Sequence, residues 1–273
     1  MTGSSNGYSE GHSNGYTEGT VQVGGTALTM IRGGSGRPLL VLHEELGHPG
    51  WLSWHKALAE DHLLNIPIHP GFGTLPRADW VTGVRDLAGF YSRMLGDMAV
   101  EPVDVIGFSL GGWIAAEMAA ACADQFNSMV LVAPMGIRPR DGEIKDLFVV
   151  TARAYLDASV HDAENTPEFA ALYGGATTPE QYETWEDARA ESARLAWKPY
   201  MHNDSLSPLL EGVRGLPTLL IWGREDQIVP LQSGQIYNRS IAGSELAVFD
   251  DCGHRPETEQ TEQFVNRVRN FLA

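Results

Sequence analysis

Cysteine is scarce in this 273-residue chain, which contains only Cys122 and Cys252. Two cysteines so far apart provide neither a disulfide framework nor a ligand-spaced pair for a metal. Basic residues are also few, because 19 Lys and Arg stand against 35 Asp and Glu, a formal net charge of −16. Such a chain is not attracted to phosphate backbones or anionic lipid, so we expect neither a nucleic acid nor a membrane partner.

Long apolar runs are missing as well. No stretch approaches the length of a bilayer crossing, and residues 1–20 lack the apolar segment of a signal peptide. From these absences we expect a cytoplasmic protein with reduced thiols. The length and the 43% hydrophobic content fit one fairly large domain, or one domain with an insertion. No pattern predicts an oligomeric state.

The N-terminus carries an approximate repeat, S-N-G-Y-S-E-G followed by S-N-G-Y-T-E-G. Its Gly, Ser and Asn content buries too little apolar surface to offset the entropy of ordering. The composition therefore predicts a flexible tail over residues 1–19.

From residue 20 onward, short β-type runs alternate with helical patterns, which is typical of βαβ units in an α/β fold. We expect a mostly parallel, doubly wound sheet that starts with a hairpin at 21–32, turning at Gly24 and Gly25. Buried strands are predicted at 38–43, 63–68, 103–108, 129–133, 217–222 and 245–249, and helices at 53–62, 81–98, 110–123 and 259–272. Residues 135–208 lack a strand pattern, so we expect a helical insertion between core segments 20–134 and 209–273.

The most specific signal is V-D-V-I-G-F-S-L-G-G-W, residues 103–113, in which a predicted strand runs through Gly107-x-Ser109-x-Gly111 into a helix. Glycines on both sides allow a sharp turn where the serine takes strained dihedral angles and its hydroxyl projects from the sheet. The start of the helix points backbone N–H groups at the same place, where they would stabilise an oxyanion. The pattern predicts a nucleophile elbow, with a plain glycine turn as the alternative.

A serine nucleophile needs a base, and the base needs an acid that fixes its tautomer. Asp226 follows the strand predicted to end at 222, and His254 follows the strand predicted to end at 249. Residues beyond the carboxyl ends of parallel strands face one crevice, so these two side chains can meet Ser109 there. The chain order of serine, acid and histidine is the one expected downstream of such an elbow.

Three other acids compete with Asp226 for the role of orienting acid. Asp250 and Asp251 are too close in sequence to His254 to reach its far ring nitrogen. Glu225 adjoins Asp226, and we favour Asp226 because of the motif described next.

These residues resemble the α/β-hydrolase fold superfamily, in its cap-bearing branch. The resemblance runs from about residue 20 to the end of the chain. It rests on G-F-S-L-G-G at 107–112, W-G-R-E-D at 222–226 with Pro230, C-G-H at 252–254 with Pro256 and Glu259, and H-P-G-F-G at 69–73. The last is similar to the family's D-x-P-G-F-G turn without its acid. The resemblance implies that residues 135–208 form a cap over the crevice. Candidates for its pocket lining, unless they only pack the cap on the core, are Trp197, Tyr200, Met201 and His202.

The resemblance also implies a hydrolase of a small, partly apolar substrate that needs no cofactor. Esterases, lactonases and carbon–carbon bond hydrolases of meta-cleavage products share the fold and the serine. The last group commonly has Asn before the serine and Trp after the histidine, where this chain has Phe108 and Arg255. Because the missing Asn removes an expected anchor for a substrate carboxylate, we favour a carboxylic ester or lactone hydrolase. A meta-cleavage hydrolase and a non-catalytic ligand-binding protein are the alternatives.

The loop L-H-E-E-L-G-H-P-G-W, residues 42–51, places two acids between His43 and His48. A zinc helix needs two histidines four apart, whereas these are five apart and Gly47 and Pro49 break any helix, so a metalloenzyme is the weaker interpretation. In the family, a loop at this place carries H-G-x-x-G and supplies one oxyanion donor.

In that comparison His43 matches the family's histidine and Glu44 stands in the place of its glycine. The backbone N–H of Glu45 is our candidate for one oxyanion donor, and that of Leu110 for the other. A carboxylate facing this site would oppose the developing negative charge, so we expect both glutamates to turn away or to pair with a cation. The candidate substrate-binding residues are His43, Glu44, Phe108, Trp197 and Arg255.

Overall fold

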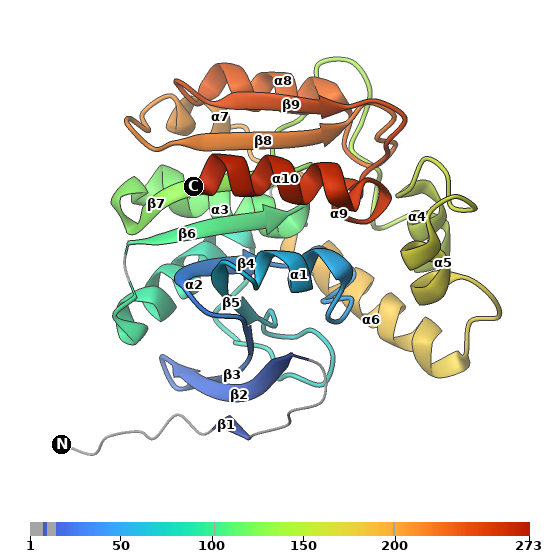
Figure 1. Ribbon diagram of the computed structural model, residues 1–273, viewed down its shortest axis with the longest axis horizontal. Coiled ribbons are helices and arrows are strands. Elements are labelled where there is room, and N and C mark those ends of the chain that lie inside the picture. The colour runs from blue at the N-terminus through green and yellow to red at the C-terminus, as the bar shows by residue number, and fades with distance from the viewer. Residues whose placement is uncertain (1–7, 10–14, 101, 199) are drawn as a thin grey trace.

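A nine-stranded sheet with helices on both faces forms the centre of the computed structural model, which describes residues 8–9, 15–100, 102–198 and 200–273 (Figure 1). The strands are β1 (Tyr8–Ser9), β2 (Tyr16–Val23), β3 (Thr26–Gly33), β4 (Arg37–Leu42), β5 (His62–Pro67), β6 (Val103–Phe108), β7 (Phe126–Val132), β8 (Thr218–Gly223) and β9 (Glu245–Phe249). The helices are α1 (Ser53–Leu58), α2 (Val84–Met98), α3 (Leu110–Ala121), α4 (Ala152–Ala158), α5 (Pro167–Tyr173), α6 (Pro179–Leu195), α7 (Leu206–Leu210), α8 (Leu231–Ser240), α9 (Pro256–Glu259) and α10 (Thr261–Leu272).

The sheet has the order β1-β2-β3-β5-β4-β6-β7-β8-β9. The strands from β5 to β9 run parallel, while β1, β2 and β3 pair antiparallel and β3 pairs antiparallel with β5. This arrangement confirms the predicted α/β class with a mostly parallel sheet. Because parallel strands are covered on both faces, β6 and β8 are buried along their whole length, which explains their nearly continuous apolar sequences.

The predicted hairpin is present, with β2 and β3 joined through Gly24 and Gly25 at φ 57° and 86°. The hairpin is longer than predicted, because β2 begins at Tyr16 and pairs along its length with β3. Residues 16–19 therefore lie in the sheet and not in the predicted tail, and Tyr16 stacks on Trp51 at 5.2 Å. Residues 8–9 form β1, and the rest of the predicted tail, 1–7 and 10–14, lies outside the described residues.

Two hydrophobic layers hold the helices on the sheet. Helices α2 and α3 pack on one face, where α3 is buried over most of its surface because it consists largely of Ala and Gly. Helices α1 and α10 cover the other face, and α10 contributes the apolar stripe Phe264, Val265, Val268 and Leu272. Helix α1 ends at Leu58, earlier than predicted, and the predicted C-terminal helix corresponds to α10, which the short α9 precedes.

The segment 135–208 contains α4, α5, α6 and the start of α7, and its described residues contribute no strand to the sheet. Helices α4, α5 and α6 lie beyond the arrowhead ends of the central strands, where the loops after β4 and β6 also lie (Figure 1). None of the helices in the described ranges combines the length and the apolar character that a membrane crossing requires.

Candidate active site

Ser109 occupies the sharp turn between β6 and α3, with φ 47° and ψ −108°. A Cβ atom on Gly107 would lie 2.5 Å from the carbonyl oxygen of Gly111, and one on Gly111 would lie 2.1 Å from that of Leu42. Side chains at either glycine would collide with backbone, so the turn closes only with glycine there. The strained serine conformation is the one that the G-x-S-x-G pattern predicts.

The turn brings Ser109 into contact with the predicted histidine. Its Oγ lies 2.9 Å from Nε2 of His254, and Nδ1 of His254 lies 2.8 Å from Oδ2 of Asp226. The other oxygen of Asp226 accepts hydrogen bonds from the backbone N–H groups of Ile228 and Val229, at 2.8 and 2.9 Å. Because these bonds hold the carboxylate, it can fix the imidazole with Nε2 directed at the serine.

The rival acids have other partners. Glu225 accepts a 2.9 Å hydrogen bond from the backbone N–H of Cys252 and so holds the loop that carries the histidine. Asp250 pairs with Arg224, and Asp251 lies at a turn with φ 53°. Asp226 is the acid bonded to His254 in the structure.

The site is enclosed, and enclosure changes the proton affinity of the histidine. Burial by itself would lower the pKa of His254, but the negative charges of Asp226 and Glu45 outweigh it and raise that pKa to about 9. The imidazolium form of His254 is therefore stabilised by the protein itself.

His43 lies in the loop after β4 and serves the architecture of that loop. Its Nε2 accepts a hydrogen bond from the backbone N–H of His69 at 2.9 Å, and its Nδ1 donates to the carbonyl oxygen of Glu44 at 2.8 Å. The ring stacks on that of His69 at 3.6 Å, and His69 Nδ1 contacts the hydroxyl of Tyr91. Burial and, second, the neighbouring His69 lower the pKa of His43. The imidazole is therefore neutral, with one ring nitrogen as donor and the other as acceptor.

Glu44 forms a bidentate ion pair with Arg255, with both oxygens 2.7 Å from guanidinium nitrogens. The prediction that a cation pairs with this glutamate is confirmed. Arg255 also donates to Ser159 Oγ at 2.7 Å and lies 5.5 Å from the centre of the Tyr173 ring. The guanidinium that follows the histidine is thus neutralised by Glu44 and hydrogen-bonded through Nε and Nη1.

Glu45 does not turn away from the site, and its only cationic neighbour among the described residues is His254. The Glu45 side chain is completely buried, neither carboxylate oxygen has a well-formed hydrogen bond among the described residues, and Oε1 lies 4.0 Å from Nε2 of His254. The loop is held in this position because Ser192 of α6 donates a 2.6 Å hydrogen bond to the carbonyl oxygen of Glu45. Glu45 therefore faces Nε2 of His254, and the protonated form of that ring is the cation within ion-pair distance of its carboxylate.

Both predicted oxyanion donors lie in this neighbourhood, with Glu45 in the loop after β4 and Leu110 at the start of α3. Within the described part of the chain, no hydrogen bond takes up the backbone N–H of either residue. Both groups are available to a ligand.

The inserted segment contacts the candidate site through residues that no sequence pattern predicts. The carbonyl oxygen of Ser159 accepts a 2.8 Å hydrogen bond from the backbone N–H of His254. Tyr155 of α4 is fully buried and its hydroxyl has no well-formed hydrogen bond among the described residues. Burial raises the pKa of Tyr155 well above its usual value, and the charge of Glu45 and hydrogen bonding to it raise it further. No spacing or motif marks Ser159, Ser192 or Tyr155, because they meet the site only through the fold.

Four of the five candidate substrate-binding residues, His43, Glu44, Phe108 and Arg255, line one small cavity of about 20 Å³. That volume accommodates one water molecule. Trp197 does not belong to it, because it is 61% exposed and packs against Phe148 and Tyr200 on the outside of the inserted segment. Its expected role in lining the pocket is wrong in this structure, because its side chain lies on the surface just beyond the end of α6 at Leu195.

Two further features concern other kinds of site. Among the described residues, no group of three or more His, Cys, Asp or Glu side chains is arranged to hold a metal ion.

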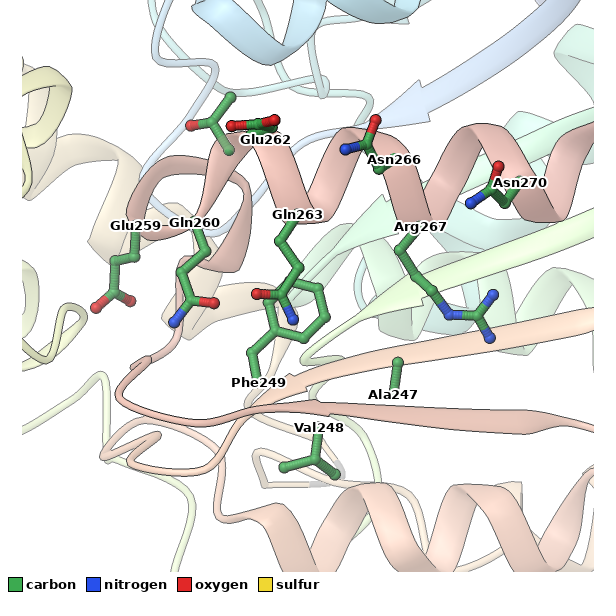
Figure 2. Close-up of a pocket in the computed structure, with 11 residues that line it drawn as sticks. Ala247, Val248, Phe249, Glu259, Gln260, Glu262, Gln263, Asn266, Arg267 and Asn270 are labelled. Atoms are coloured by element: carbon green, nitrogen blue, oxygen red, sulfur yellow. The ribbon is translucent and has the colours of Figure 1, made fainter.

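A surface hollow of about 850 Å³ lies between β9 and α10, with Gln260, Gln263, Asn266 and Arg267 among its lining residues (Figure 2). It contains none of the predicted catalytic residues.

Comparison with known proteins gives consistent results. Residues 39–267 match the model of the alpha/beta hydrolase family. A 2-hydroxymuconate semialdehyde hydrolase from Pseudomonas sp. strain CF600 is 30% identical over 255 residues, 88% of each chain. A 2-hydroxy-6-oxo-2,4-heptadienoate hydrolase from Pseudomonas putida is 26% identical over 267 residues, 93% of this chain and 95% of the relative. The solved structure of a 2-hydroxy-6-oxo-6-phenylhexa-2,4-dienoate hydrolase from Rhodococcus sp. strain RHA1 superposes with a TM-score of 0.76 at 20% identity, covering 94% of this chain and 98% of the other.

Proposed function

Because this chain belongs to the alpha/beta hydrolase family, we propose that it is a serine hydrolase that cleaves a carbon–carbon bond next to a carbonyl group in a small molecule. The observation that carries the hydrolase proposal is the continuous hydrogen-bonded row from Ser109 through His254 to Asp226. The carbon–carbon bond is supported by the relatives, whose names describe hydrolases of 2-hydroxy-6-oxo-dienoates and of a muconate semialdehyde. This proposal replaces the preference for an ester that Phe108 and Arg255 suggest.

The proposed reaction begins when Ser109 Oγ attacks the carbonyl carbon while Nε2 of His254, 2.9 Å away, takes the hydroxyl proton. Asp226 holds the ring and stabilises the imidazolium. The bond to the leaving carbon then breaks, its electron pair stays on that carbon, and His254 returns the proton to the leaving fragment. Water, deprotonated by His254, hydrolyses the acyl-enzyme in the second half of the reaction.

The tetrahedral oxyanion needs donors, and we assign them to the backbone N–H groups of Leu110 and Glu45. One such donor is worth about 100- to 1,000-fold in rate. The segment 135–208 acts as a cap in this proposal. Its support is that Ser159 and Ser192 bond to the backbone of His254 and Glu45, the two residues that border the reacting atoms.

Hydrolysis of a carboxylic ester or lactone is the second candidate, and a specific observation favours it. The relatives' names denote carboxylates, whereas Arg255 beside this site is neutralised by Glu44 and Phe108 offers no polar anchor. A substrate without a carboxylate would not need either group.

A substrate panel separates the two candidates. We would assay 2-hydroxy-6-oxohexa-2,4-dienoate, p-nitrophenyl butyrate and a lactone, and label the enzyme with a fluorophosphonate. Ser109→Ala should lose labelling and at least about 10⁴-fold in turnover. Ser128→Ala, a buried serine of β7 bonded to Asp104, is the matched control and should retain both.

The ratio of kcat/KM values then decides between a carbon–carbon and an ester bond. An enzyme that neither labels nor turns over any of the three compounds would contradict the hydrolase proposal itself.

A further inference from the structure

Glu45 is a buried acid that raises the pKa of His254 but takes no part in bond making or breaking in the proposed reaction. It has 0% exposure, and both carboxylate oxygens lack a well-formed hydrogen bond among the described residues. A buried carboxylate without well-formed hydrogen bonds is costly, and in native proteins such a group usually has a partner that is a ligand or a water molecule. The position of Glu45 therefore needs a functional explanation.

The surroundings of Glu45 identify where that partner sits. Its Oε1 lies 4.0 Å from Nε2 of His254, a gap too wide for a direct hydrogen bond but one that a single hydroxyl or amino group bridges. The phenol of Tyr155 is also buried, and it is a polar neighbour of Glu45, whose charge and hydrogen bonding both act on it. The Glu45 carboxylate thus has the Tyr155 phenol and the catalytic nitrogen of His254 as its polar neighbours.

The charges around this point select against an anion. Asp226 and Glu45 both act on His254, and Arg255 is bound bidentately by Glu44. Burial raises the pKa of Glu257, a third acid beside Arg255, to about 8, so it adds little negative charge at neutral pH. A substrate carboxylate placed here would compete with Glu45 for the single His254 imidazolium and would meet no unpaired guanidinium.

We propose that Glu45 is a specificity-determining residue whose carboxylate accepts a hydrogen bond from a hydroxyl or ammonium group of the substrate next to the reacting carbonyl. The substrate class is therefore a carbonyl compound that presents a hydrogen-bond donor, and not a carboxylate, at Glu45. This inference rests on the proposed function, because it uses Ser109 as the nucleophile. It also separates the chain from relatives whose named substrates are dienoates, because such a substrate must turn a hydroxyl toward Glu45 here.

Substituted phenylboronic acids test the inference without knowledge of the natural substrate, because boronates bind reversibly to a catalytic serine. We would measure how 3-hydroxymethyl, 3-aminomethyl, 3-ethyl and 3-carboxy derivatives compete with fluorophosphonate labelling of Ser109. The wild type should bind the hydroxymethyl and aminomethyl compounds at least about tenfold more tightly than the carboxy compound, as expected for a charge-assisted hydrogen bond.

Glu45→Gln removes the charge and keeps the shape, so it should bring the carboxy compound to within about threefold of the hydroxymethyl one. Glu117→Gln is the matched control, since Glu117 is a buried acid whose partners are Trp113, Asn203 and Arg85, and it should leave the wild-type ranking unchanged.

The outcomes are separable. Failure of the wild type to react with fluorophosphonate would defeat the proposed function. Labelling with equal competition by all four boronates, or tightest binding of the carboxy compound, would overturn the role of Glu45 while leaving the serine hydrolase intact. The wild-type ranking alone decides this point if Glu45→Gln does not fold, and an unchanged ranking in a folded Glu45→Gln also overturns the inference.

Discussion

The turn after β6 and the loop after β4 follow neighbouring parallel strands and meet at the same site, yet they are built differently. The turn after β6 is dictated by backbone contacts, because Gly107 and Gly111 leave no space for a Cβ atom. The loop after β4 is held by side chains from distant parts of the chain, including Arg255 and Ser192. The first is a local steric requirement, and the second is a set of long-range pairings.

The largest effect on this comparison should come from Arg255→Met. Loss of the guanidinium leaves Glu44 buried without its partner, which we expect to cost about 3–5 kcal/mol in the free energy of unfolding. The double variant Glu44→Gln/Arg255→Met should recover at least half of that loss. Urea denaturation of the four proteins in the cycle measures it, and equal destabilisation of the single and double variants would refute the pairing as the cause.

Gly111→Ala tests the steric side, because its Cβ would lie 2.1 Å from the carbonyl oxygen of Leu42 and so push the turn away from β4. We expect a loss of about 1–3 kcal/mol in stability and about 100-fold in kcat/KM, from displacement of Ser109. Gly89→Ala, in the open interior of α2, is the control and should stabilise the protein by about 0.5–1 kcal/mol. Full activity in Gly111→Ala would show that the close approach to β4 is dispensable.

The pH dependence of kcat/KM should report the two carboxylates that face His254. The free enzyme needs neutral His254 as its base, and the pKa of that residue is raised to about 9, so activity should rise about tenfold per pH unit up to that value. Asp226 and Glu45 are the acids responsible, and Arg255 opposes them. Glu45→Gln should move the midpoint to lower pH. A wild-type midpoint near 6.5 would contradict the raised pKa of His254, and an unchanged midpoint in Glu45→Gln would show that Glu45 does not contribute to it.

Acid should destabilise the protein by protonating two histidines, His48 in the loop after β4 and His69 in the turn after β5. Burial lowers the pKa of His48 to about 4 and that of His69 to about 3. The unfolded chain binds protons near pH 6.5 and the folded chain does not, so stability is present above that pH and is lost as pH falls from about 6.5 toward 4. The slope is about 1.4 kcal/mol per pH unit for each histidine. His48→Asn should lower the pH dependence of the unfolding free energy between pH 4.5 and 6 by about 1.4 kcal/mol per pH unit, which is the contribution of one proton. An unchanged slope would show that His48 does not contribute.

The fold follows closely from local patterns. Predicted strands 103–108 and 245–249 coincide with β6 and β9, because a buried strand reads as an apolar run bounded by turn residues. The start of β2 at Tyr16 differs from the prediction because Gly- and Ser-rich composition suggests a tail, whereas pairing with β3 gives those residues an ordered partner. Trp197 differs for a related reason, since an aromatic residue carries no signal of whether it faces a pocket or solvent.

The sequence by itself determined the α/β architecture and the positions of Ser109, Asp226 and His254 along it, because apolar periodicity, glycine sterics and strand ends are local properties. Tertiary structure decided which partners the two glutamates between His43 and His48 contact. Glu44 meets Arg255 across 211 residues of chain, while Glu45 next to it is left facing His254. Adjacent side chains can reach different partners, and the charge of a buried group depends on which partners the fold brings within a few ångströms.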